Sequence, residues 1–117
     1  MSARLRPAAR LGRRLVLEAP THAPDGAGGL VAAWAPLGAL WADIAFAAPR
    51  ASGRPGADAF SLPVRITVRA MPSASPQRPR PGQRLREGAR LFLVDAVAEA
   101  DGEGRFLLVH AREEDAP

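Results

Sequence analysis

The chain has 117 residues, 47% of them hydrophobic, which suits one domain with a buried core and is too hydrophobic for a fully disordered protein. Its 12 prolines and 11 glycines argue against a helical bundle, and the absence of cysteine excludes disulfides and thiolate metal sites. No apolar run approaches the roughly 20 residues of a membrane-spanning helix, so we expect an intracellular protein without a signal peptide.

Charge is distributed unevenly along the chain. Residues 1–90 hold 14 arginines and 5 acids, a balance of +9, whereas residues 91–117 hold 2 arginines and 7 acids, a balance of −5. All 16 basic residues are arginine, which is typical of a GC-rich genome and does not by itself indicate nucleic-acid recognition. A basic body with an acidic end can steer towards polyanions or dock head-to-tail with copies of itself.

The N-terminal part is predicted to be a basic arm followed by a strand. Residues 1–13 lack strand alternation, and residues 14–19 read as a first strand that Pro20 ends. The arginines of this region are Arg4, Arg6, Arg10, Arg13 and Arg14.

A glycine-rich turn comes next. Pro24 presets φ, Asp25 can cap its own turn, and the glycines that follow it permit positive φ. The turn residues are Asp25, Gly26, Gly28 and Gly29.

Two strands are predicted at 30–37 and 39–46, separated by Pro36 and Gly38. A helix is the competing interpretation of this alanine-rich stretch, but the two-residue period favours strands. Trp41 falls on the face opposite Leu40 and Ile44, whereas Trp34 sits in the first of the two strands.

The middle of the chain alternates loops with one clean strand. Residues 47–62 are predicted to be a long flexible loop carrying Arg50 and Arg54. Residues 63–70 place Val64, Ile66 and Val68 on one face of a strand, and residues 72–81 are expected to be extended and polyproline-like because of their prolines.

A hairpin is predicted at the end. A short extended piece at 84–86 leads to a turn, strands at 90–98 and 105–112 are joined by an acidic turn at 99–104, and residues 113–117 form an acidic tail. The sum is an all-β fold, a small antiparallel barrel or sandwich of about six or seven short strands spanning 14–112.

No catalytic pattern is present. The two histidines, His22 in a turn and His110 in a half-buried strand position, lack partners spaced for a metal site, and Ser52 and Ser61 lack a nucleophile-elbow context. Residues 25–29 lack the lysine and hydroxyl residue of a phosphate-binding loop. We therefore expect no enzyme activity, no cofactor and no metal.

Several segments in order resemble the head–tail joining proteins of tailed bacteriophages and gene transfer agents: RRLVLEAP, PDGAGGLVAAW, LWADI, VRITVR and GARLFLVDAV, across most of residues 13–112. The stretch 72–81 is longer than the family pattern. The resemblance implies a virion structural protein, a β-barrel whose copies form a ring (dodecameric in relatives) between the portal or adaptor and the tail. The ring continues the DNA channel and retains the packaged DNA.

The resemblance also implies roles for particular residues. The 47–62 loop would reach into the channel, where Arg50 and Arg54 would meet double-stranded DNA phosphates without reading bases; an ordinary solvated loop is the alternative. One tryptophan is expected to anchor the core, and Trp41 to be a subunit-interface anchor. Arg65 and Arg69 are expected to be solvated or paired across subunits with acids such as Glu113, and the arm to dock onto a neighbouring ring or to remain disordered.

The resemblance thus implies a head-closure, or stopper, subunit located in the virion and in the host cytoplasm before assembly. Two alternatives remain open. One is another connector layer, an adaptor or a tail terminator. The other is a free oligonucleotide-binding β-barrel, although no aromatic residues interleave with Arg65 and Arg69 to stack bases.

Overall fold

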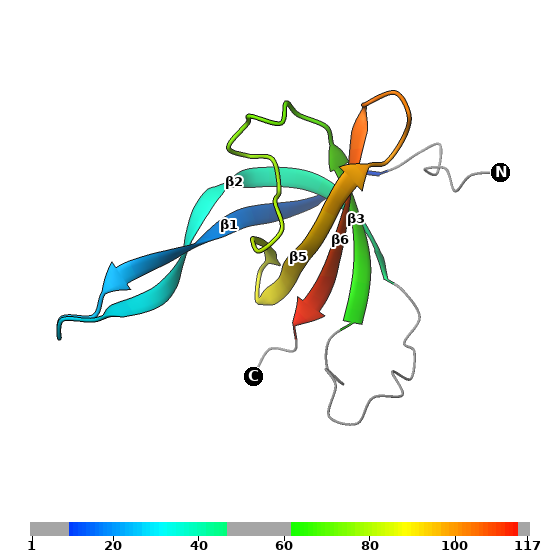
Figure 1. The fold of residues 1–117 in the computed structure, drawn as a ribbon. Coiled ribbons are helices and arrows are strands. Elements are labelled where there is room, and N and C mark those ends of the chain that lie inside the picture. Colours follow the sequence, from blue (N-terminus) through cyan, green and yellow to red (C-terminus); the bar gives the residue numbers. More distant parts are fainter. Residues whose placement is uncertain (1–9, 47–61, 115–117) are drawn as a thin grey trace, which may run out of the picture.

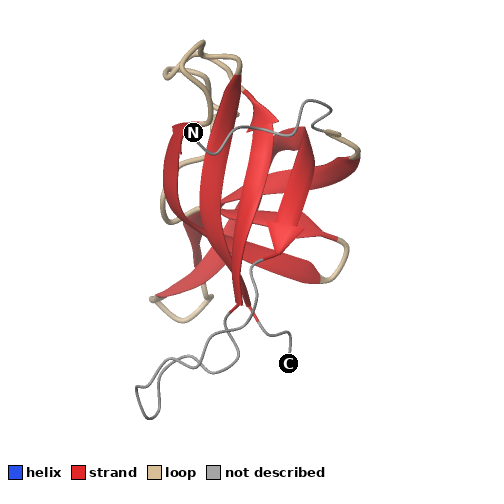
Figure 2. Cartoon of the chain, turned by 90° about the vertical axis from the view of Figure 1, so that its right-hand side faces the viewer, coloured by secondary structure: helices blue, strands red, loops and turns tan. Residues whose placement is uncertain are grey.

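Six antiparallel strands make up the regular structure of residues 10–46 and 62–114, the part of the chain that the computed structural model describes (Figures 1 and 2). No helix occurs in these two segments. The strands are β1 (Arg13–Pro24), β2 (Leu30–Phe46), β3 (Leu62–Arg69), β4 (Arg84–Glu87), β5 (Arg90–Glu99) and β6 (Phe106–Glu114).

The strands form one sheet that closes on itself. Their order is β1-β2-β3-β6-β5-β4, and β4 returns to pair with β1. The closing ladder is short and joins Val16 to Arg86, Leu17 to Leu85 and Glu18 to Arg84. The predicted all-β antiparallel fold is confirmed.

The barrel interior follows from the two-residue alternation of the strands. Along β3, Val64, Ile66 and Val68 point inward, as predicted for this segment. Phe92 is the largest fully buried side chain, and leucine, valine, isoleucine and alanine fill the rest of the core. Neither tryptophan belongs to this core, so the expectation that one of them anchors it is wrong.

Two strands run well beyond the barrel. Pro20 does not end β1, and Pro36 and Gly38 do not divide β2, which is a single strand of 17 residues. Past Glu18, β1 pairs only with β2, so each strand has a free edge on which a proline removes no ladder hydrogen bond. We call residues 19–37, which form this projecting two-stranded segment at the left of Figure 1, the ribbon.

The connection between β3 and β4 is folded back on itself. Backbone hydrogen bonds join Ser75 to Pro72, Arg78 to Ser75 and Gln83 to Arg80, and Pro79 is buried. The prediction of a polyproline-like extension at 72–81 is therefore wrong, because consecutive turns satisfy the backbone groups that an extended chain would leave to water.

Candidate assembly surfaces

The tip of the ribbon is a turn organised by Asp25. Its Oδ1 accepts hydrogen bonds from the backbone N–H groups of Ala27 (2.7 Å) and Gly29 (3.0 Å). These bonds lower the pKa of the Asp25 carboxyl group. Gly26 and Gly28 adopt positive φ, whereas a Cβ at Gly29 would lie 2.7 Å from Oδ2 of Asp25. The predicted turn residues thus act in two ways, by backbone conformation and by close approach of the carboxylate.

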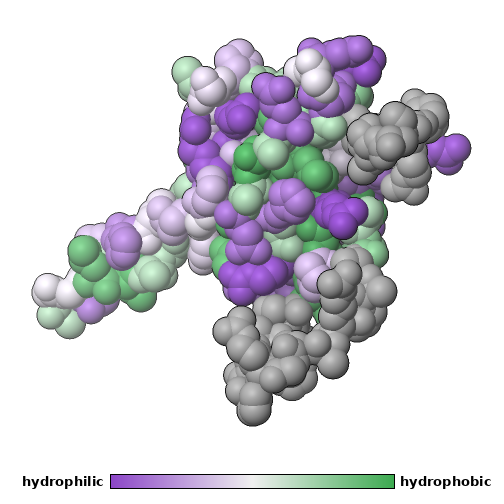
Figure 3. All heavy atoms as spheres, turned by 45° about the vertical axis from the view of Figure 1, so that its right-hand side comes forward, coloured by the Kyte–Doolittle hydropathy of each residue, from purple (hydrophilic) through white to green (hydrophobic). Residues whose placement is uncertain are grey.

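Beside this turn the ribbon exposes apolar side chains. Leu30 is 70% exposed and Val31 is 49% exposed. Figure 3 shows hydrophobic residues gathered towards the end of the projecting ribbon, while the visible face of the barrel mixes polar and hydrophobic residues. A two-stranded ribbon has no core to cover either of its faces, so this tip is a candidate contact surface.

A buried carboxylate lies where the ribbon leaves the barrel. Glu18 is only 6% exposed and accepts hydrogen bonds from Nε of Arg84 (2.6 Å) and Nε of Arg86 (2.9 Å). Burial raises the pKa of Glu18, but the bonds from both arginines outweigh it, and the pKa is lowered overall. The Arg84 guanidinium also stacks over Trp34, 4.2 Å from the ring centroid.

The bend at the same place depends on Gly38. Its φ is +147°, a conformation that side chains other than glycine rarely adopt, and the register of β1 with β2 shifts between Leu17 and Glu18. A Cβ at Gly38 would lie 2.8 Å from Nε2 of Gln77, so the folded β3–β4 connection packs against the strand here. The base of the ribbon is therefore held from two sides, by Glu18 and by Gln77.

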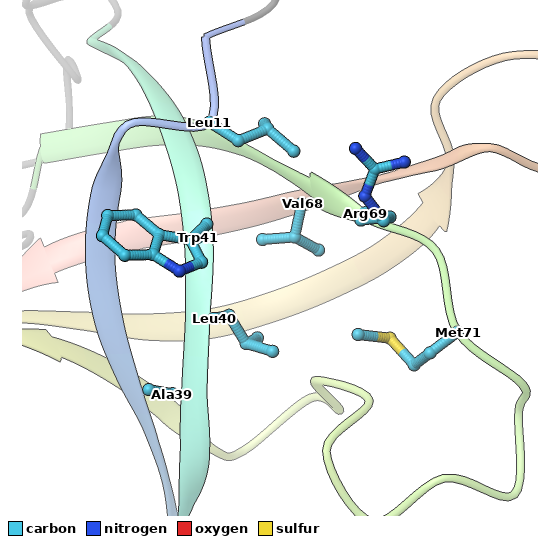
Figure 4. Close-up of a pocket in the computed structure, with 7 residues that line it drawn as sticks. All are labelled: Leu11, Ala39, Leu40, Trp41, Val68, Arg69 and Met71. Carbon is cyan, nitrogen blue, oxygen red and sulfur yellow. The ribbon is translucent and has the colours of Figure 1, made fainter.

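A pocket of about 360 Å³ opens at one end of the barrel beside β2 and β3. Figure 4 shows Leu40, Val68 and Met71 directed towards one another, with Arg69 above them at the end of β3 and the indole of Trp41 on the other side of β2, over β1. Its lining residues are Leu11, Ala39, Leu40, Trp41, Val68, Arg69 and Met71. Trp41 is 57% exposed, so the predicted interface anchor is available for contact with another surface.

Ion pairs surround Phe46, the last described residue before the 47–61 segment. The guanidinium of Arg90 lies 4.9 Å from the Phe46 ring centroid and that of Arg13 lies 5.7 Å away. Arg13 bonds Glu87 (2.6 Å) and Arg90 bonds Glu113 (2.7 Å). These hydrogen bonds lower the pKa of both carboxyl groups.

The predicted interface residues on β3 face outward. Arg65 and Arg69 are exposed, and Arg69 lies 5.8 Å from the Phe106 ring centroid. Glu113, expected as a partner across subunits, is instead bound by Arg90 of the same chain. His110, opposite Arg65, is exposed, and the prediction of a half-buried position is wrong because its side chain points away from the core.

The predicted docking arm and channel arginines are placed only in part. Arg4, Arg6, Arg50 and Arg54 lie outside the described residues. Arg10 is exposed, whereas Arg13 begins β1 and is held by Glu87, and Arg14 is exposed opposite Trp41 in the β1–β2 ladder.

Two features were missed by sequence reasoning. In the Glu18 cluster, Arg84 and Arg86 are separated from Glu18 by 66 and 68 positions in the sequence, so no local sequence pattern predicts the cluster. Leu30 and Val31 follow a glycine-rich turn inside residues 15–49, a stretch without a single arginine in this arginine-rich chain, and that composition could have marked the tip.

Metal and membrane features are absent from the described residues. Across 10–46 and 62–114, no three histidine, aspartate or glutamate side chains come together as a metal site. Within the same segments, no helix has the length and apolar character to cross a bilayer.

Comparison with known proteins shows a family to which the chain is similar and a similar chain in a solved assembly. The sequence model of the phage head completion proteins matches residues 6–114. A chain in the solved structure "Virion of native gene transfer agent (GTA) particle" is 42% identical, with a TM-score of 0.72, covering 96% of this chain and 100% of that one. Among curated proteins, none matches.

Proposed function

Because this chain belongs to the phage head completion protein family, we propose that it is a head-closure, or stopper, subunit of a tailed phage, prophage or gene-transfer particle. The family is one of structural virion proteins, and the resemblance noted in the sequence is borne out. The observation that carries the proposal is 42% identity with a virion chain over 96% of this one. Its copies would form a ring between the portal or adaptor and the tail and continue the DNA channel.

The described surfaces suit such a connector. The barrel supplies a rigid frame, since its core is closed on all sides by paired strands. The ribbon and the pocket beside Trp41 would serve as contact surfaces at two separate places on one subunit, as a ring of identical subunits requires.

Retention of DNA is proposed for residues 47–61. Arg50 and Arg54 would face phosphates at the centre of the ring, and contacts repeated around it would add to a salt-sensitive hold without base readout. The charged cluster of Arg13, Glu87, Arg90 and Glu113 around Phe46 would fix the barrel end from which this segment leaves β2.

The test is deletion of the gene for this chain in a cell that produces particles. We expect heads without tails whose DNA is open to nuclease, and complementation with the wild-type chain should restore tailed, nuclease-resistant particles. Tailed particles that keep their DNA in the absence of the chain would overturn the proposal.

The DNA contact is tested separately with Arg50→Ala/Arg54→Ala. Particles should assemble but leak DNA, and the leak should increase with salt because fewer phosphate contacts remain. Arg105→Ala, an exposed arginine paired with Asp101 in the β5–β6 turn, is the matched control and should retain DNA. A tail terminator or adaptor would tolerate the double change, whereas a free oligonucleotide-binding barrel would lose solution affinity for nucleic acid.

A further inference from the structure

We propose that the tip of the ribbon of one subunit inserts into the pocket lined by Leu40, Val68 and Met71 of a second copy. This head-to-tail contact would repeat around an axis. The inference deepens the ring proposed above and rests on it. It names the two surfaces that join neighbouring subunits.

The two surfaces cannot meet within one chain. Val31 and Trp41 lie ten residues apart on the same continuous strand, a separation of about 33 Å at the rise of a β-strand. The tip therefore has to find its pocket on another molecule. A contact between two different patches of identical subunits is heterologous and either closes into a ring or continues as a filament.

The tip and the pocket are chemically complementary. The tip presents Leu30, Val31 and the carboxylate of Asp25. The pocket is lined by the buried core side chains of Leu40 and Val68 and by the partly buried Met71, with Arg69 above them. The ribbon, residues 19–37, contains no arginine and one acid, Asp25, so its charge is opposite to that of the basic body.

The cations near the pocket are available for such a contact. Within the part of the chain that the structure describes, neither Arg69 nor Arg14 has a carboxylate partner, unlike Arg13, Arg84 and Arg90. Asp25 arriving at the rim would therefore meet a guanidinium that stacks on Phe106 and is held by no carboxylate of the described residues.

The ribbon is built for contact through side chains and not through strand addition. Pro20, Pro24 and Pro36 interrupt the free edges with residues that have no N–H donor. An isolated two-stranded ribbon is also only marginally stable in water, and insertion of its tip into a second subunit would cover the apolar surface that it exposes.

Crosslinking in assembled particles tests the contact, and because this chain has no native cysteine, its crosslinks can form only at the introduced positions. Ala32 at the tip and Ala39 in the pocket lining would both be replaced by cysteine in one full-length chain. The two positions are seven residues apart on β2, about 23 Å, so no disulfide can form within a chain. Purified particles would be oxidised with copper phenanthroline and run on a denaturing gel without reductant.

We expect a ladder of dimers, trimers and higher multimers from Ala32→Cys/Ala39→Cys. The matched control Ala32→Cys/Ala98→Cys, with its second cysteine on an exposed position of β5, should give no ladder. Particles that contain the chain but show no ladder would overturn the inference and leave the proposed function standing. Dimers alone, or links to a different virion protein, would overturn it as well. If the wild-type chain is missing from particles, the proposed function itself fails.

A second variant tests the energetics. Val31→Asp would place a carboxylate in an apolar pocket, and incorporation into particles should fall at least about tenfold. Its melting temperature should match that of the wild-type chain, because Val31 lies outside the core. Ala98→Asp is the matched control. Wild-type incorporation of Val31→Asp would contradict the inference.

Discussion

The barrel and the ribbon are made from the same two strands, yet only one of them has an interior. In the barrel half of β1 and β2, Leu15, Leu17 and Ala42 are completely buried. In the ribbon half, Leu30 and Val31 are largely exposed. The difference indicates that the ribbon depends mainly on strand pairing and on a few side chains at its two ends, whereas side-chain burial sets the stability of the barrel.

The largest effect should come from the centre of the barrel. Phe92→Ala removes the largest fully buried side chain and should lower the free energy of unfolding by about 3–5 kcal/mol, through lost burial and the cavity left behind. Urea denaturation followed by circular dichroism would measure it.

The matched change in the ribbon is Trp34→Ala, which loses a half-buried ring and its stacking with Arg84. It should cost about 1 kcal/mol or less. If both substitutions cost the same, the ribbon would share the stability of the barrel and the distinction between them would fail.

An intermediate effect is expected where the two regions meet. Glu18→Gln removes the charge that Arg84 and Arg86 bind and should cost about 1–3 kcal/mol at neutral pH. Because the pKa of Glu18 is lowered in the folded protein, its stabilising contribution is present above the ordinary pKa of glutamate and disappears as the pH falls through the folded value.

The difference in unfolding free energy between the wild-type protein and Glu18→Gln should therefore become smaller as the pH falls. Thermal unfolding of both proteins between neutral and strongly acidic pH would measure this difference. Other carboxyl groups with a lowered pKa, such as Glu87 and Glu113, are present in both proteins, so their contributions to the pH dependence cancel. A gap that stays constant with pH would show that Glu18 acts by shape and not by charge.

The smallest effect belongs to the tip. Leu30→Ser should change the free energy of unfolding by no more than about 0.5 kcal/mol, because Leu30 is 70% exposed. The melting temperature should therefore change very little. Differential scanning calorimetry of the isolated chain is the measurement. A loss above about 1 kcal/mol would mean that the tip stabilises its own subunit.

The strands of the barrel wall could be predicted because their residues alternate against a core. The segment around Val64, Ile66 and Val68 and the final hairpin were placed within one or two residues of the observed β3, β5 and β6. Alternation is a reliable signal wherever one face of a strand is buried.

The ribbon could not be predicted in the same way. Pro20, Pro36 and Gly38 are breakers in the interior of a sheet, and only the three-dimensional pairing reveals that these positions lie where edges are free. The bend at Gly38 and the contact with Gln77 also depend on residues distant in sequence.

The candidate surfaces also differ in whether they depend on adjacent residues or on residues distant in sequence. The turn at Asp25 could be predicted because it depends on adjacent residues. The cluster of Glu18 with two arginines and the pocket beside Trp41 depend on which strands become neighbours, and topology decides that. The arginines of the 47–61 segment remain predictions.

The continuity of β1 and β2 has a mechanical consequence. Both strands pass from the wall into the projection, so tension applied at its far end travels through backbone ladders into the wall. It arrives beside the β1–β4 seam, where only three residue pairs close the circle. We therefore expect a pull on the ribbon to load this short ladder first, and the ion pairs of Glu18 with Arg84 and Arg86 of β4 to reinforce it.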